Sequence, residues 1–472
     1  MFANHQTRYL IFSPFLLLTL LASCPGLSRA QAQSPFLGSV PTGQATGTTL
    51  ELSLREAFER ALKYNLGVIE SREDTRAAHS VRLRSLNALL PNLSARVSGS
   101  LEQINLRAQG FNISIPGANI STIVGPFGVA DARAYLSQEI FNWSDIQGVK
   151  SASESERASQ YTYENDRDLV VLTTANAYLL VISDLATVDS IRAQVKTAGT
   201  LYDQDVDQNK QGVVASIDVL RAQVELQTEQ QRLIAAQNQL AIDKLTLARI
   251  IGLPNGQEFN LTDSVPYAPL DGVSLDQALR QAYSTRPDYL SAKTQVQAAE
   301  LAGGAAAAEN YPYLSADTNY GDIGSPNFGS SHGTFSVAVS LNIPIFQGSR
   351  VRADKLQADS ALQQRKAELA DLSGKIDDQV RTAFYNLKSS SDLVAVARSN
   401  VDLATQTLAQ ARDRFAAGVA DNLEVVQAQE SVASANQSYI ASLYSFDLSK
   451  VSLAQAVGVA QQSALHYLLG GK

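Results

Sequence analysis

The sequence predicts a mixed α/β membrane protein with two structural repeats, each combining a β-hairpin with long antiparallel helices. Three observations lead to this class. A set of motifs occurs twice, two long stretches lack proline and carry a seven-residue apolar spacing, and shorter segments alternate apolar with polar residues. Each copy spans roughly 200 residues, which is too long for one unit of a solenoid.

The duplication appears at matched positions in both halves. SLREA at 53–57 returns as SLDQA at 274–278, and LPNLSA at 90–95 returns as YPYLSA at 311–316, each 221 positions later. GV at 212–213 returns at 418–419, 206 positions later. We therefore divide the chain into a first repeat, a linker, a second repeat and a C-terminal tail, at residues 50–253, 254–273, 274–460 and 461–472.

The N-terminus has the form of a targeting segment. Residues 1–30 combine Arg8, a short apolar run and small residues at a cleavage site, which together predict a signal peptide. LASC at 21–24 also matches a lipobox, so Cys24 is a possible lipidation site. Both forms of processing leave no cysteine inside the fold, because Cys24 is the single one. Residues 31–49 are expected to be flexible.

Composition excludes several classes of protein. The charged fraction is 18% and the net charge is −8 without a basic patch, which argues against nucleic-acid binding. After the signal segment there is no run of 18 apolar residues, so we expect no membrane-spanning helix. The remaining histidines, His79, His332 and His466, are scattered, and no phosphate-binding glycine loop is present. The sequence thus predicts no enzyme, no cofactor and no metal site.

Two proline-free stretches predict very long helices. Helices over 145–209 and 347–416 would be about 98 Å and about 105 Å long, at 1.5 Å per residue. The alternative is several shorter bundle helices that break at Gly148, Gly199 or Gly374. After each stretch an apolar residue recurs every seven positions, as in coiled coils: Val219, Leu226, Leu233, Leu240 and Leu247, then Val425, Val432, Tyr439, Phe446 and Leu453.

Glycine marks the point where each long helix reverses. Gly212 and Gly418 both follow a long helix and precede valine, which suits a C-terminal cap in the left-handed conformation. Each repeat therefore contains an antiparallel helical hairpin. A third helix is expected over 51–89 and over 274–309, ended by proline.

Four segments between the helices alternate apolar and polar residues. They begin near Leu93, Ala132, Leu314 and Phe335, and most are about ten residues long, enough for a tilted strand to cross a bilayer. The aromatic residues Phe141, Trp143 and Phe346 lie where strand returns to helix, as in a membrane girdle. The alternative is an ordinary hairpin with one face on a soluble core.

The two strand hairpins differ in their loops. The first loop covers 102–130 and the second, around 321–333, is shorter by 16 residues. Such variation is typical of a surface loop, which we place on the extracellular side. Four strands cannot close a barrel and lipid does not tolerate an open sheet edge, so the chain must oligomerise. Two chains would supply eight strands and three would supply twelve.

The order of these elements resembles the TolC family of outer-membrane efflux proteins. The motifs that carry the resemblance are SL-x-EA at 53–57 with Ala61-Leu62 and Asn65, LP-x-L at 90–93, and RF-x-x-GV at 414–419 leading to LEVV-x-AQ at 423–429. The resemblance covers about residues 50–460. It implies a homotrimer with a twelve-stranded β-barrel in outer-membrane lipid and a twelve-helix α-barrel in the periplasm.

The resemblance also implies a function, a location and partners. We expect a passive outer-membrane channel that exports small molecules from a tripartite pump, joined by a periplasmic adaptor to an inner-membrane transporter. The alternatives are a conduit for type I protein secretion, a pore-free periplasmic coiled-coil protein, and an adaptor. An adaptor lacks paired membrane strands, which disfavours that last reading.

The family's functional positions can be placed on this sequence. The adaptor-contacting helix tips correspond to Gly212, Val213, Gly418 and Val419. The acidic pore constriction corresponds to Glu424, with Asp218 as its counterpart in the first repeat. Here the sequence departs from two stacked acidic rings, because Gln427 and Arg221 stand one turn after these carboxylates.

Overall fold

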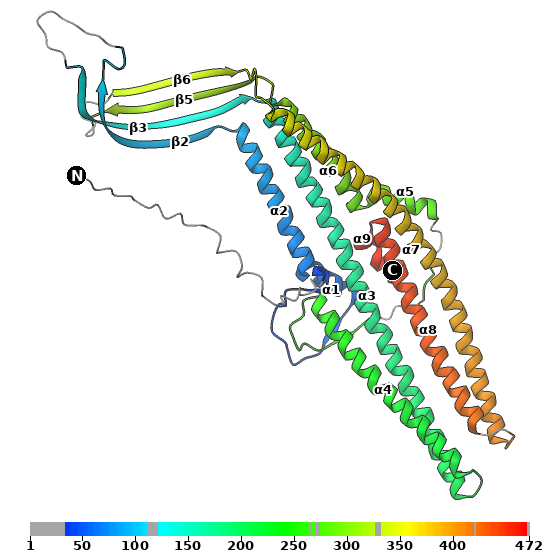
Figure 1. Ribbon diagram of the computed structural model, residues 1–472. Helices are drawn as coiled ribbons and strands as arrows, with labels where there is room; N and C mark the ends of the chain where they lie inside the picture. The colour runs from blue at the N-terminus through cyan, green and yellow to red at the C-terminus, as the bar shows by residue number, and fades with distance from the viewer. Residues whose placement is uncertain are drawn as a thin grey trace, which may run out of the picture.

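The computed structural model describes residues 34–110, 121–263, 267–269, 274–325, 332–419 and 422–469. The expected signal peptide and Cys24 lie outside these residues. The described part is elongated, with a four-stranded sheet at one end and the tips of two helical hairpins at the other (Figure 1).

Both long helices are continuous. Helix α3 covers Trp143–Lys210 and helix α7 covers Arg350–Ala416. Gly148, Gly199 and Gly374 lie inside these helices without breaking them, so the alternative of several shorter helices is wrong. A single glycine costs a helix only about 1 kcal/mol, which the packing of neighbouring helices offsets.

Each long helix pairs with a shorter returning helix. Helix α4, Ser216–Ile250, packs along α3, and helix α8, Asn422–Val457, packs along α7. The residues of the predicted seven-residue spacing face inward, because four of them are buried and the other six are partly covered. The buried ones are Leu247, Val425, Phe446 and Leu453. This spacing keeps one apolar stripe on the side of the partner helix. The two helical hairpins are therefore confirmed.

The shorter helix expected in each repeat is two helices. Residues 51–89 contain α1, Leu54–Tyr64, and α2, Leu66–Leu86, followed by a 3-10 turn over Asn87–Leu89. Residues 274–309 contain α5, Leu275–Thr285, and α6, Pro287–Ala308. The expectation of one helix over each range was wrong.

Local chemistry explains both breaks. Asn65 has an extended backbone, and its side-chain oxygen accepts a hydrogen bond from the Gly67 N–H at 3.0 Å, which caps α2. Arg286 is also extended because the residue before a proline avoids the helical region. Pro287 then begins α6, where the N–H that proline lacks is not needed.

The repeated SLREA motif is a helix start. The Ser53 hydroxyl accepts from the Glu56 N–H at 3.2 Å, and the Glu56 carboxylate accepts from the Ser53 N–H at 2.9 Å. In the second copy the Gln277 N–H donates to the Ser274 hydroxyl at 3.3 Å. Such caps satisfy backbone donors that the first turn leaves free.

The four predicted strands form one antiparallel sheet in the order β2-β3-β5-β6. Strands β3 and β5 join the two repeats, with Tyr135 opposite Asn319. The first two strands are longer than predicted and extend into the first loop, whose residues 111–120 lie outside the described part. The bounds are β2 Asn92–Asn105, β3 Ile123–Phe141, β5 Tyr313–Gly324 and β6 His332–Asn342.

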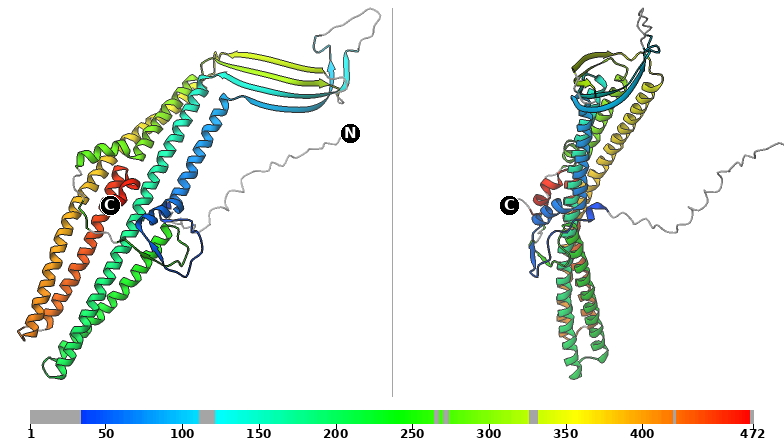
Figure 2. Two further views of the ribbon diagram at one scale, coloured as in Figure 1. Left: turned by 180° about the vertical axis from the view of Figure 1, so that it is seen from behind. Right: turned by 90° about the vertical axis from the view of Figure 1, so that its left-hand side faces the viewer.

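The main hydrophobic core lies near the middle of the long helices, where α1, α5 and α9 gather (Figures 1 and 2). It includes Phe58, Tyr178, Phe446 and Leu453. Helix α3 contributes an 18-residue window of mean hydropathy 1.7, apolar enough to cross a membrane by length and composition, and 44% of this window is buried. We interpret this apolar part of α3 as part of the core, because its residues Val170, Val171 and Tyr178 are buried in the main hydrophobic core.

Three segments are more ordered than the sequence indicated. Residues 34–49 were expected to be flexible, but the Val40 N–H donates to the Tyr64 carbonyl at 2.9 Å. The linker contains strand β4, Phe259–Leu261, which pairs with β1, Leu50–Leu52. The expected tail contains most of α9, Ala460–Leu469. Each of these segments packs against the core through contacts with residues far along the chain. Sequence periodicity does not reveal such contacts.

Candidate functional site

The tip of the first helical hairpin is a complete glycine cap. Gly212 has a φ of +74°, and its N–H donates to the Asn209 carbonyl at 2.9 Å. The Val213 N–H donates to the Gln208 carbonyl, also at 2.9 Å. Together these two bonds form a Schellman motif, which terminates a helix and turns the chain.

The second tip repeats this geometry. Gly418 has a φ of +70°, and its N–H donates to the Phe415 carbonyl at 3.0 Å. The Val419 N–H donates to the Arg414 carbonyl at 3.0 Å. Val213 and Val419 are 70% and 71% exposed, so each tip presents an apolar side chain at the end of the molecule. The two predicted tips therefore have matched shape and matched surface chemistry.

Both predicted constriction carboxylates are paired with arginine. Asp218 accepts from Arg221 at 3.0 Å along α4, and Glu424 contacts Arg414 at 3.2 Å across the second hairpin. The Asp218 side chain is more covered than that of Glu424. Arg221, one helical turn after Asp218, therefore forms an ion pair with the Asp218 carboxylate. Whether these residues line the pore stays a prediction.

A buried polar contact links the two hairpins near their tips. The Asn422 side-chain amide on α8 donates to the Asp205 carboxylate on α3, and these residues are 1% and 0% exposed. Burial raises the pKa of Asp205 to about 6, with a further contribution from the negative charge of Asp218. Sequence reasoning missed this contact. A signal was present, because Asp205 follows Ala198 and Leu201 on one helix face where an apolar residue is expected.

The opposite end of the molecule carries an exposed apolar sheet. Nearly every side chain on both edge strands is exposed, and this includes the apolar side chains of one face. These are Leu93, Val97 and Leu101 on β2 and Phe335, Val337, Val339 and Leu341 on β6. Among the described strands, β2 and β6 each pair on one side only. Two open edges and an exposed apolar face are a liability in water. This sheet is complete only with further strands and an apolar environment.

The predicted girdle residues lie between the sheet and the helices. Phe141 ends β3 and Trp143 begins α3, with their ring centroids 6.4 Å apart. Phe346 lies between β6 and α7 and is 88% exposed. The structure thus gathers these aromatic residues at one level of the molecule. Their role at a membrane surface stays a prediction.

Within the described residues, no group of three or more His, Cys, Asp or Glu side chains could hold a metal ion. His79 contacts Glu156 through Nδ1 at 2.9 Å, and Arg82 contacts the same carboxylate at 3.0 Å. This cluster joins α2 to α3 and is explained by helix packing.

Comparison with known proteins gives one consistent family. The model of the outer membrane efflux protein family matches residues 85–253 and 278–459. The outer membrane protein TolC of Escherichia coli is 22% identical over 88% of this chain and 83% of its own length. The probable efflux pump outer membrane protein TtgC of Pseudomonas putida is 26% identical over 78% of this chain and 75% of its own. The alkaline protease secretion protein AprF of Pseudomonas aeruginosa is 22% identical over 70% of each chain.

Solved structures show the same fold. A membrane protein from Pseudomonas aeruginosa superposes with a TM-score of 0.74 over 90% of this chain and 97% of its own, at 17% identity. The outer membrane protein VceC of Vibrio cholerae superposes with a TM-score of 0.72 over 86% and 96%, also at 17% identity. The chain therefore belongs to the outer membrane efflux protein family, whose members are trimeric export channels of the outer membrane that extend into the periplasm.

Proposed function

We propose that three copies of this chain form a passive channel that exports small molecules from a tripartite efflux pump. The open four-stranded sheet carries this proposal. Three such sheets would supply twelve strands, enough to close a barrel around an aqueous channel, whereas eight strands leave an interior that side chains fill. The exposed apolar side chains of β2 and β6 would then face lipid.

The helical hairpins would continue this channel through the periplasm. Each chain contributes two hairpins of nearly equal length, so a trimer would place six hairpins around one axis. Many side chains along α3, α4, α7 and α8 are polar and exposed, which suits a water-filled tube. Energy for transport would come from an inner-membrane transporter, and the chain itself would have no catalytic role.

The hairpin tips would contact a periplasmic adaptor. Val213 and Val419 support this assignment, because an exposed apolar side chain on a rigid turn is a suitable anchor for a partner. The rigid turn itself comes from the glycine caps at Gly212 and Gly418. Two matched tips per chain would offer the adaptor six similar contact points in a trimer.

Glu424 and Asp218 would narrow and charge the periplasmic end of the pore. A ring of carboxylates attracts cations and repels anions. The pairing of each carboxylate with an arginine weakens this field, so we expect moderate rather than strong cation selectivity.

Conductance of the purified protein in a planar lipid bilayer tests the channel. We expect trimers on native mass spectrometry and discrete conductance steps that increase when Gly418→Pro disrupts the second tip. Trimers that never conduct, with intact or disrupted tips, would support a pore-free coiled-coil protein. Extraction of the protein in soluble form without detergent would favour an adaptor.

Protein secretion is the second candidate, and the match to AprF favours it. The two functions are separated by complementation of a host that lacks its own channel. Restored growth in the presence of toxic small molecules supports efflux. Restored release of a type I secreted protease, without a change in drug tolerance, supports secretion.

A further inference from the structure

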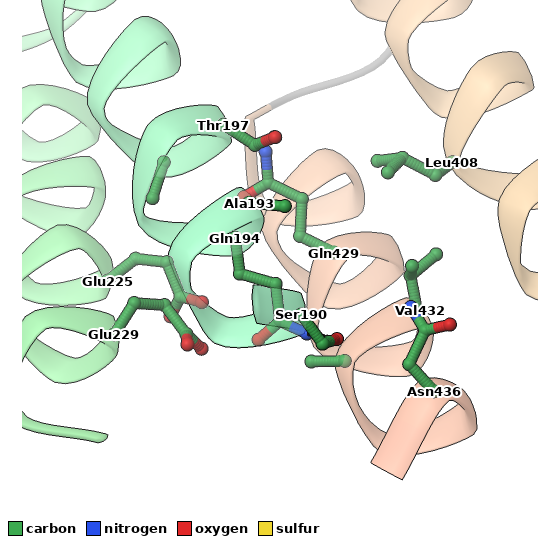
Figure 3. A pocket seen from close by; sticks show the side chains of 12 residues that line it. Ser190, Ala193, Gln194, Thr197, Glu225, Glu229, Leu408, Gln429, Val432 and Asn436 are labelled. Carbon is green, nitrogen blue, oxygen red and sulfur yellow. Dashed lines mark hydrogen bonds between the residues drawn. The ribbon is translucent and has the colours of Figure 1, made fainter. Parts of the chain in front are cut away.

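A cavity with a volume of about 370 Å³ lies between the two helical hairpins of one chain. It is lined by residues of α3, α4 and α8, with Leu408 of α7 at one side (Figure 3). Glu225 and Glu229 extend from α4 toward Gln194 and Ser190 of α3. The cavity is therefore acidic on one wall.

The acidic wall contains an unsatisfied carboxylate oxygen. Glu229 is only 2% exposed, and its Oε1 accepts from Arg232 at 2.6 Å. Its Oε2 has no hydrogen-bond partner among the described residues. A buried carboxylate oxygen without a donor is costly, and most such atoms in proteins are satisfied. This oxygen therefore calls for a donor from outside the chain.

The charge on this wall is also only partly balanced. Burial raises the pKa of Glu225, and the nearby carboxylates of Glu229 and Glu430 raise it further, whereas Arg232 lowers it. Glu225 thus feels the charge of two further carboxylates and of one guanidinium group. A second cation in the cavity would lower the electrostatic energy of the site.

The opposite wall carries an independent unsatisfied group beside an apolar surface. Gln429 of α8 is 9% exposed, and its side-chain Nε2 has no partner among the described residues. In Figure 3 its amide extends toward Thr197 of α3. Leu408, Val432 and Ala433 provide apolar surface close by. The cavity thus combines an anionic wall, one amide donor and an apolar floor.

A second cavity of about 700 Å³ lies next to the first, and Ser190, Gln194 and Ala433 line both. Asp184 and Glu430 line the second cavity, and Arg232 is the one basic side chain on the described lining of either. Negative charge therefore extends along the seam between the hairpins.

We propose that the cavity at Glu225 and Glu229 binds a small organic cation with an ammonium group and an apolar body. The ammonium group would donate hydrogen bonds to both carboxylates, and it carries three donors for this purpose. The apolar body would lie against Leu408 and Val432. A metal ion fits less well, because no group of three or more metal-ligating side chains occurs among the described residues. The site does not depend on the channel proposal.

The second repeat provides an internal comparison. At the matched positions, 206 residues after Glu225 and Glu229, the chain has Ser431 and Ala435. The equivalent seam therefore lacks both carboxylates. We accordingly expect one cation per chain, not two.

The test is isothermal titration calorimetry of the full-length, detergent-solubilised protein with 2-phenylethylammonium chloride. The neutral analogue 2-phenylethanol serves as the matched ligand. We expect one saturable site per chain for the amine and none for the alcohol. Glu229→Gln and Glu225→Gln should each weaken amine binding by roughly ten- to a hundredfold, as expected when a charge-assisted hydrogen bond is lost. Glu368→Gln, on the exposed surface of α7, should leave it unchanged.

Several outcomes would overturn the proposal. These are the absence of saturable amine binding, equal affinity for amine and alcohol, and equal loss of binding in Glu368→Gln. A structure of the assembled protein with a basic side chain of a neighbouring copy in the cavity would also overturn it. If Glu229→Gln impairs folding, as judged by circular dichroism, Glu225→Gln and Leu408→Ala still decide the matter. The binding experiment does not measure conductance, so a failure to bind the amine would not count against the proposed channel.

Discussion

The two helical hairpins of this chain have the same backbone but different interiors. Both end in a glycine cap with the same pair of hydrogen bonds, and both present an exposed valine at the tip. In the first hairpin, Asp205, Glu229 and Asp243 are buried. At the matched positions the second hairpin has Ala411, Ala435 and Ser449.

This difference shows which features a duplicated fold must keep. The glycine cap is fixed by geometry, because a side chain at a positive φ strains the backbone in both copies. Buried charge is not required by geometry, and removing a carboxylate from water costs several kcal/mol. The first hairpin therefore buries carboxylates at positions where the second has small neutral residues, whereas the second buries its own ion pair, Asp447 with Lys450, elsewhere on α8. We expect the two copies to behave alike at the membrane and at the exposed tip turns, and differently in the buried interior near each tip.

The largest expected loss of stability comes from charged substitutions on the sheet, and it should be the same in both repeats. Val97→Arg on β2 and Val337→Arg on β6 should each cost about 2–4 kcal/mol if these side chains face lipid. Fewer heat-resistant trimers in the membrane fraction would measure this loss. Ser98→Arg and Ser336→Arg, on the opposite faces of the same strands, should be tolerated. Equal tolerance of all four variants would contradict a lipid-facing apolar surface.

The next largest loss of stability should distinguish the second hairpin from the first. Ala411→Asp places a carboxylate in the second hairpin at the position that matches Asp205, within the small core of Leu201 and Val425. Without a partner such as Asn422, this buried group should cost about 1–3 kcal/mol, because it would be protonated and would still lack hydrogen-bond partners. Faster hydrogen exchange near residue 411 would report this cost, and Ala411→Asn is the uncharged control of the same size. Unchanged exchange would mean that the two tips are chemically equivalent.

Of the two tips, the first should show the stronger pH dependence, because Asp205 lies beside it. The pKa of Asp205 is raised to about 6 in the folded chain from 3.8, so the folded state binds the proton more tightly than the unfolded state. Stability from this group is therefore present at low pH and is lost as pH rises through about 6. Lowering the pH from 7 to 5 should stabilise the first tip by about 1 kcal/mol, or several-fold in hydrogen exchange corrected for intrinsic rates.

Asp205→Asn is the control for this measurement, because an amide keeps the contact with Asn422 but does not titrate in this range. Residues 398–407 of α7 provide a comparison in the second hairpin, because this segment excludes Asn422, the partner of Asp205. An equal pH response in both hairpins, or an unchanged response in Asp205→Asn, would assign the effect to another group.

The smallest effect concerns the predicted constriction. The ion pairs of Asp218 and Glu424 are partly exposed, so Asp218→Asn and Glu424→Gln should change stability by less than about 1 kcal/mol. If both residues line the pore, each variant should lower its cation selectivity, measured as the reversal potential in a salt gradient. Glu424→Gln should have the larger effect, because Glu424 is more exposed. An unchanged reversal potential in both variants would place the constriction elsewhere.

Much of the architecture could be predicted because it depends on local rules. Gly212 and Gly418 indicated the reversals, since a helix that ends in a left-handed residue favours glycine there. Alternation with period two located the strands, although their ends extended further along the sheet. Pro287 was a signal for the break between α5 and α6 that our sequence analysis did not use. The break at Asn65 was harder to find, because its side chain also donates to the distant Phe36 carbonyl.

The sequence by itself determined the duplicated hairpins, the alternation of strands and the apolar stripe of each long helix. These features follow from the fixed periods of helix and strand, which decide the face on which each residue lies. Only the tertiary structure decided that Asp205 meets Asn422, and that a Glu229 oxygen without a partner among the described residues faces a cavity. The helical or strand period predicts the face on which a residue lies. It does not predict which residue packs against that face, because the packing residue comes from a segment far along the chain.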